Sequence, residues 1–89
     1  MPVISSFYGI TVYLFTYDKD KHHLPHIHIK YGEFNAGIDI TRGKKLYGDF
    51  PRSKMTLVQA WIEIHKEDLM EDWKLAVNGE KPFKIEPLK

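Results

Sequence analysis

The chain has 89 residues, 43% of them hydrophobic and 28% charged, which is the composition of one small folded domain. Thirteen Lys and Arg against twelve Asp and Glu leave a net charge of +1, too balanced to indicate a nucleic-acid binder or an acidic tail by itself. Cysteine is absent, which excludes disulfide frameworks, cysteine-based zinc sites and thiol nucleophiles.

The first 17 residues carry no charge, but they are not typical of a membrane or export segment. They are fewer than the roughly 20 apolar residues that a spanning helix needs, and Pro2 and Gly9 interrupt them. They also lack the basic start and the small-residue cleavage site of a secretory peptide. We therefore expect a cytoplasmic protein without a membrane segment.

Residues 8–17 are rich in β-branched and aromatic side chains and predict a strand. One face of this strand carries Tyr8, Ile10, Val12 and Leu14, and the other carries Thr11, Tyr13, Phe15 and Tyr17. Because both faces are largely apolar, we expect the strand to lie inside the sheet or to be covered on both sides. A polar loop follows over residues 18–25.

Two alternating segments, residues 26–31 and 33–40, predict a hairpin around Gly32-Glu33, a glycine-first pair that suits a type II′ turn. The two-residue loop fixes a register in which apolar residues meet: Tyr31 faces Phe34, Ile29 faces Ala36, and Ile27 faces Ile38. On the other face, Lys30 then meets Asn35, His28 meets Gly37, and His26 meets Asp39.

A further hairpin is predicted around the three-residue loop Arg42-Gly43-Lys44. This loop pairs Ile40 with Leu46 and Ala36 with Phe50. Tyr47 and Asp49 then join the histidine face, with Asp49 opposite Gly37.

The last third of the chain predicts a helix and a tail. After Pro51, Ser53 is a candidate helix cap, and Gly79 after Asn78 is a stop signal. A mainly apolar stripe recurs at helical spacing and includes one histidine: Val58, Trp61, Ile62, His65, Leu69, Trp73, Ala76 and Val77. Residues 65–68 are a candidate break that would divide the helix into two. Residues 80–89 contain Pro82 and Pro87 and predict an extended tail that packs on the body or docks a partner.

The expected architecture is one α+β domain over residues 1–89, with a sheet in 1–50, a helical region in 51–79 and the tail in 80–89. The sheet is an antiparallel meander of three to four strands, followed by one long C-terminal helix. This helix should cover the face that carries Ile27, Ile29, Phe34 and Ile38, because a sheet this small needs a lid on its apolar side.

Chemistry is most strongly indicated by a histidine cluster, since four of the five histidines, His22, His23, His26 and His28, lie within seven residues. One hypothesis is acid–base work on RNA without a metal or other cofactor, with His26 and His28 as the proton-transfer groups. Asp39 would orient His26. Lys30, Arg52 and Tyr47 would bind the substrate, Lys21 being a further candidate for the phosphate, and Tyr13, Phe15 and Tyr17 would offer a stacking surface.

Two alternatives stay open. In the first, the histidines bind a metal such as zinc, with His22, His26 and His28 as ligands and Asp49 or Asp39 completing the set. In the second, the histidines are structural and the protein is a non-catalytic module whose helix and tail dock a partner protein. An exposed edge at the first or last strand leaves a homodimer open as well.

Short motifs spread over nearly the whole chain occur together: Met1-Pro2-Val3-Ile4-Ser5, Phe7-Tyr8-Gly9-Ile10, His22 before Pro25-His26-Ile27-His28, Tyr31-Gly32-Glu33, Ile38-Asp39-Ile40, Pro51-Arg52, Trp61 with His65 and Glu67, Trp73, and Lys84-Ile85-Glu86-Pro87-Leu88. This set resembles the small bacterial proteins of the domain-of-unknown-function 4160 family. The chain departs from the family pattern in two places, which together involve three residues. His23-Leu24 replaces its usual Asn-Pro, and Ser53 replaces a second Arg after Pro-Arg.

The resemblance implies a gene pair. Genes of this family often stand beside one for a second small protein, of the domain-of-unknown-function 2442 family, in an arrangement similar to a toxin–antitoxin operon. The chain would then be the toxin-like or regulatory member, with a small antitoxin-like protein as its partner. Small toxins of this type are often ribonucleases, which agrees with the RNA hypothesis by analogy.

Overall fold

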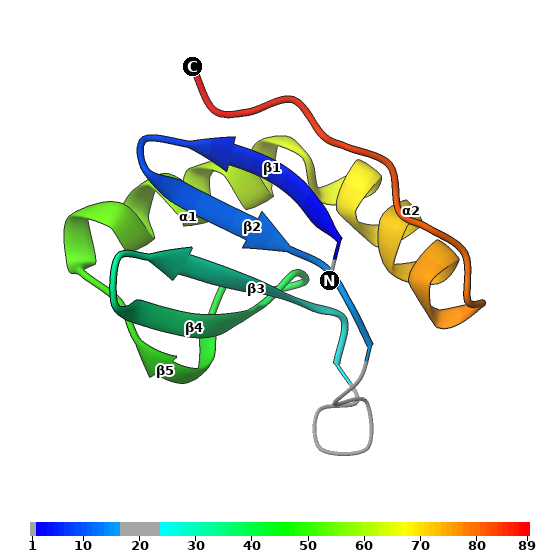
Figure 1. Cartoon of the computed structure of the whole chain (residues 1–89), viewed down its shortest axis with the longest axis horizontal. Coiled ribbons are helices and arrows are strands. Elements are labelled where there is room, and N and C mark those ends of the chain that lie inside the picture. The colour runs from blue at the N-terminus through cyan, green and yellow to red at the C-terminus, as the bar shows by residue number, and fades with distance from the viewer. Residues whose placement is uncertain (1, 17–23) are drawn as a thin grey trace.

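The computed structural model describes residues 2–16 and 24–89. These residues form an antiparallel sheet in the order β1-β2-β3-β4-β5, followed by two helices and an extended tail (Figure 1). The elements are β1 Val3–Phe7, β2 Ile10–Tyr13, β3 His26–Tyr31, β4 Phe34–Asp39, β5 Lys45–Asp49, α1 Arg52–Ile64 and α2 Lys66–Val77. The fold is α+β, as predicted, but it has five strands rather than three to four, and the long helix is divided into two at the candidate break.

The additional strand is β1, which pairs with β2 across a turn at Tyr8-Gly9. Both turn residues have positive φ, 50° and 80°, the combination that type I′ hairpin turns require. The sequence prediction had placed Tyr8 inside a strand, because residues 8–17 are rich in β-branched and aromatic side chains. Tyrosine rarely adopts positive φ, so the residue itself does not indicate a turn. The predicted alternation after this turn is confirmed, since Ile10, Val12 and Leu14 are fully buried.

The predicted pairing of β3 with β4 is confirmed at every position. The two strands pair as His26 with Asp39, Ile27 with Ile38, His28 with Gly37, Ile29 with Ala36, Lys30 with Asn35, and Tyr31 with Phe34. This register buries Ile27, Ile29 and Ile38 and leaves the histidine positions on the opposite face.

The predicted pairing of β4 with β5 was wrong by two residues. Gly37 lies opposite Tyr47, and Asp49 lies opposite Asn35 rather than Gly37. Ile38 then pairs with Lys45, so Leu46 is an extra residue in a bulge. The cause is the turn, which begins earlier than predicted because the N–H of Gly43 donates to the carbonyl of Asp39 at 2.7 Å.

The helical region divides at His65, within the predicted break, into α1 and α2. Helix α1 begins directly after Pro51 without a side-chain cap, so Ser53 is not the cap that was predicted. The predicted stop is confirmed: Gly79 has φ +80°, and the N–H of Glu80 donates to the carbonyl of Leu75 at 2.8 Å. These features define a Schellman motif, which satisfies the last carbonyls of α2.

The helices cover the predicted face of the sheet, and α1 passes behind the strands in Figure 1. Val58, Trp61 and Ile62 of α1 and Leu69 of α2 form one buried cluster with the sheet isoleucines. Phe34 was expected in this cluster, but it lies at the hairpin end and is 44% exposed. No helix among residues 2–16 and 24–89 is both long enough and apolar enough to cross a membrane.

The tail packs on the body of the same chain, returning from the end of α2 toward β1 (Figure 1). The N–H of Ile85 donates to the carbonyl of Ile4 at 2.8 Å, and the indole N–H of Trp61 donates to the carbonyl of Glu86 at 2.7 Å. The N–H of Phe83 donates to Oδ1 of Asp72 at 2.9 Å. The tail is therefore part of the folded domain.

Replacing Asp72 with Asn is expected to stabilise the protein near neutral pH. Burial raises the pKa of Asp72, while the hydrogen bond from the Phe83 N–H lowers it and the charge of Asp68 raises it further. A raised pKa means that the folded state holds the proton more tightly than the unfolded state, so ionisation costs stability as the pH rises above the ordinary carboxyl range. Asn keeps an oxygen for the Phe83 N–H and carries no charge.

Urea unfolding of both proteins at about pH 7 and about pH 3, on either side of the carboxyl range, checks this prediction. At the higher pH, we expect Asp72→Asn to unfold at a higher urea concentration than the parent. At the lower pH, the difference between their urea midpoints should be smaller. An Asp72→Asn variant that is less stable than the parent at the higher pH would contradict it.

Candidate functional site

His28, in the middle of β3, is the centre of the candidate site. Its half-buried ring stacks on Phe15, with 3.9 Å between ring centroids and 6° between ring planes. Nδ1 of His28 shares a hydrogen bond with the hydroxyl of Tyr47 from β5, and Nε2 is buried. The hydroxyl of Tyr47 therefore links this imidazole to the pocket that both residues line.

Gly37 allows Tyr47 to reach His28. It lies between the two, opposite His28 on one side and opposite Tyr47 on the other. A Cβ atom at this position would lie 2.7 Å from Cζ of Tyr47 and closer still to Cε2, which real contacts do not allow. Only a residue without a side chain lets the tyrosine ring lie across β4 at this point.

A pocket of about 230 Å³ surrounds this pair. Its lining is formed by Tyr13, Phe15, His28, Ile29, Lys30, Asn35, Ala36 and Tyr47. Tyr13, His28 and Lys30 alternate along their strands with the buried core residues that face the helices. The pocket therefore lies on the opposite face of the sheet, which we call the open face.

His26 lies behind His28 and is fully buried. Its Nδ1–H donates to the carbonyl of Leu24 at 2.7 Å, which fixes the ring orientation, because a carbonyl can only accept. The ring lies edge-on to His28, at 5.0 Å between centroids, and 5.1 Å from the ring of Trp73 in α2. His26 is thus placed to position His28 rather than to touch a substrate.

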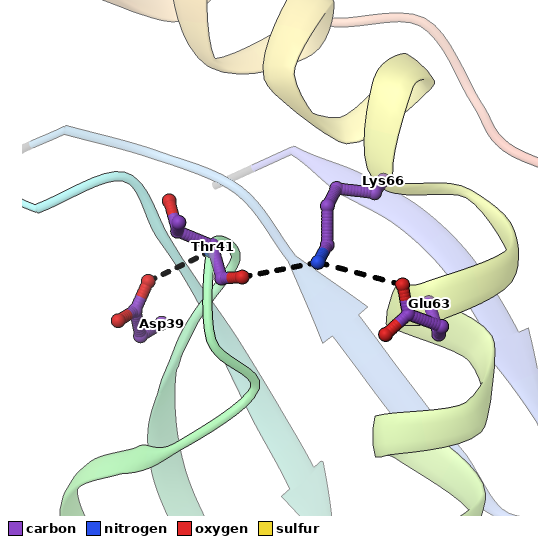
Figure 2. A network of polar contacts seen from close by, with 4 residues as sticks. All are labelled: Asp39, Thr41, Glu63 and Lys66. Atoms are coloured by element: carbon purple, nitrogen blue, oxygen red, sulfur yellow. Dashed lines mark hydrogen bonds and ion pairs between the residues drawn. The ribbon is translucent and has the colours of Figure 1, made fainter.

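Asp39 was predicted to orient His26, but its carboxylate serves the β4–β5 turn instead (Figure 2). It is 3% exposed and accepts a hydrogen bond from the N–H of Thr41 at 2.8 Å. The carbonyl of Thr41 accepts from Nζ of Lys66 at 3.0 Å, and Lys66 forms an ion pair with Glu63 at 3.4 Å. Asp39 therefore anchors the turn to the junction of α1 and α2, and the carbonyl of Leu24 holds His26.

The other predicted residues divide between the pocket and its surroundings. Lys30, the predicted substrate-binding cation, is exposed and lines the pocket. Arg52 is exposed at the start of α1 and does not line it. Asp49 lies opposite Asn35, with its exposed carboxylate 3.9 Å from Lys45. His22, on which the zinc alternative depends, lies outside the described residues, as do His23, Lys21 and Tyr17.

Within the described part of the chain, no three His, Asp or Glu side chains are grouped so that they could hold a metal ion. Two functional contacts were missed by the sequence reasoning. Trp73 was assigned to the core, yet its ring also supports His26. Asn35 was placed on the polar face without a role, and it lines the pocket beside Lys30. The role of Asn35 could have been predicted from the hairpin register, because this register places Asn35 opposite Lys30.

The comparisons with known proteins identify a family. The family described as Domain of unknown function (DUF4160) matches residues 9–74, which run from the β1–β2 turn into α2. This range contains every residue that lines the open-face pocket. No curated protein and no solved structure matches the chain. The chain belongs to the DUF4160 family.

Proposed function

We propose that this protein binds single-stranded RNA on the open face of its sheet and cleaves it without a metal ion, through the pair His28 and Tyr47. The observation that supports this most strongly is the imidazole of His28, stacked on Phe15 and hydrogen-bonded to a phenol that lines an open pocket. An imidazole held against a second titratable group beside a base-sized pocket is an arrangement suited to proton transfer.

The pocket chemistry favours RNA over other substrates. Tyr13 and Tyr47 offer aromatic rings on an exposed sheet, the surface on which unstacked bases are bound in sheet-based RNA-binding domains. The amide of Asn35 can both donate to and accept from a base edge. The ammonium group of Lys30 supplies the positive charge that a phosphodiester needs.

The geometry supports a two-group mechanism. Tyr47 accepts the proton of the 2′-hydroxyl while its own proton passes to Nδ1 of His28, and the 2′-oxygen bonds to phosphorus. The bond from phosphorus to the 5′-oxygen breaks, and the proton returns from His28 through Tyr47 to this leaving oxygen. Lys30 neutralises the charge on the phosphate, and His26 and Phe15 hold the imidazole of His28 in place.

A cleavage assay with single-stranded RNA in the presence of a chelator tests this proposal. His28→Gln and Tyr47→Phe should each lower the cleavage rate by roughly 10²- to 10⁴-fold. Tyr47→Phe should leave RNA binding nearly unchanged, because the ring remains. His65→Gln is the matched control, since His65 lies at the helix junction, and it should cleave at the parent rate. Equal rates in all four proteins, each shown to be folded, would overturn the proposal.

We further propose that the protein is the toxin-like member of a two-gene module and that a small antitoxin-like protein is its partner. What supports this is the paired gene arrangement that the resemblance to the DUF4160 family implies. A partner of this kind should suppress cleavage when it is added to the same assay.

A further inference from the structure

A second pocket, of about 280 Å³, lies between α2 and the tail and takes no part in the proposed RNA site. Of the described residues, it is lined by His65, Asp68, Glu71, Asp72, Phe83, Lys84, Ile85 and Glu86. Four of these side chains are carboxylates and one is an ammonium group. The pocket therefore favours a cationic ligand and disfavours RNA.

One of the carboxylates is not satisfied within the protein. Asp72 is 2% exposed, and its Oδ1 accepts from the Phe83 N–H. Its Oδ2 is buried and has no hydrogen-bond partner among residues 2–16 and 24–89. A carboxylate oxygen normally accepts more than one hydrogen bond, and leaving it buried without a donor costs stability. The tail thus engages one oxygen of Asp72, and the residue lines the pocket with its other oxygen unsatisfied.

An aromatic ring at the same pocket narrows the class of ligand. Phe83 is anchored by its backbone to Asp72, yet its side chain is 72% exposed. An exposed phenyl ring beside carboxylates is a suitable surface for a planar cation, because guanidinium groups stack on aromatic faces and pair with carboxylates through two parallel hydrogen bonds. A bare metal ion would make no use of this ring.

We propose that this pocket receives the guanidinium group of an arginine side chain from a partner protein, with Asp72 as its buried acceptor and Phe83 as its stacking surface. Asp68 and Glu71 are exposed and would attract the arginine before it reaches Asp72. Because the pocket lies on α2 and the tail, a protein bound there leaves the open face available. This inference does not depend on the RNA proposal.

The test is an NMR titration of the full chain with N-acetyl-arginine amide, with the Phe83 amide as the reporter because its hydrogen bond ends on Asp72. We expect a saturable shift of this amide with the arginine compound and none with the neutral isostere N-acetyl-citrulline amide. A lysine amide should bind more weakly. An equal response to citrulline or lysine amide, or no saturable response to arginine amide, would overturn the proposal.

Variants and a second ligand make the test specific. Asp72→Asn should weaken binding by at least about tenfold, and Glu71→Gln should weaken it less. Glu67→Gln changes an exposed acidic residue of α2 that does not line the pocket, and it should bind as the parent does. If the Asp72→Asn variant and the Glu71→Gln variant both bound the arginine compound as tightly as the parent does, the proposed site would be contradicted. Binding of free L-arginine without binding of the capped amide would assign the pocket to an amino acid and not to a protein.

Discussion

Replacing Gly37 with alanine should disable the candidate site and destabilise the sheet, although no proposed catalytic group is changed. The added Cβ would overlap the ring of Tyr47, which would have to leave its place across β4 and give up its hydrogen bond to His28. Overpacking of this kind costs about 1–3 kcal/mol of folding free energy. Cleavage should fall as far as it does in Tyr47→Phe, because the proton route through the phenol is lost.

A double-mutant cycle isolates this effect. In a Tyr47→Ala background the ring that the new methyl group meets is absent, so Gly37→Ala should then cost much less stability than it does in the parent. Urea unfolding of the four proteins gives both values. Equal costs in the two backgrounds would show that Gly37 is required for a reason other than its contact with Tyr47.

Trp61→Ala should have the largest effect on stability, about 3–5 kcal/mol, which is the range for removing a buried tryptophan. Trp61 is fully buried, its ring lies 5.3 Å from that of Phe7, and its indole N–H holds the carbonyl of Glu86. Since folded proteins have about 5–15 kcal/mol of stability in total, this substitution should remove a large part of the stability of the domain.

Trp61→Phe separates the two roles of the tryptophan. It keeps a phenyl ring in the core and removes the donor to Glu86 together with part of the ring volume. The tail should therefore loosen while the sheet remains folded. Hydrogen exchange should then accelerate at the tail amide of Ile85 and stay slow at the amides of β3. Uniform acceleration over the whole chain would contradict a specific role of this hydrogen bond in docking the tail.

The sequence predicted those parts of the fold that depend on local alternation. The β3–β4 register follows from two strands of clear period two and a two-residue turn, because a shift by one residue would expose Ile27, Ile29 and Ile38. The end of α2 was also predictable from a local feature, because Gly79 adopts the positive φ that ends a helix and that glycine favours.

The sequence did not predict features that carry a weak local signal or that depend on contacts between distant residues. Tyr8 adopts a positive φ for which tyrosine has no preference, so the β1–β2 turn carried no strong signal. The β4–β5 register depends on a bulge at Leu46 and on the turn held by Asp39. No pattern within the strands distinguishes that structural use of Asp39 from an orienting role beside His26.

The candidate site was predicted in part for the same reason. The face that carries His28, Lys30 and Tyr13 follows from strand periodicity. The hydrogen bond between His28 and Tyr47 depends on the two-residue shift of β5 and therefore appears only in the three-dimensional structure.

The most direct test of the RNA proposal is an NMR titration with a short single-stranded RNA, read at every assigned residue. We expect the largest saturable shifts on the open face, at Tyr13, His28, Lys30, Asn35 and Tyr47, and small shifts at the indole of Trp61 on the other face. Shifts confined to α2 and the tail, or the absence of a saturable response, would contradict the proposal that the open face binds RNA.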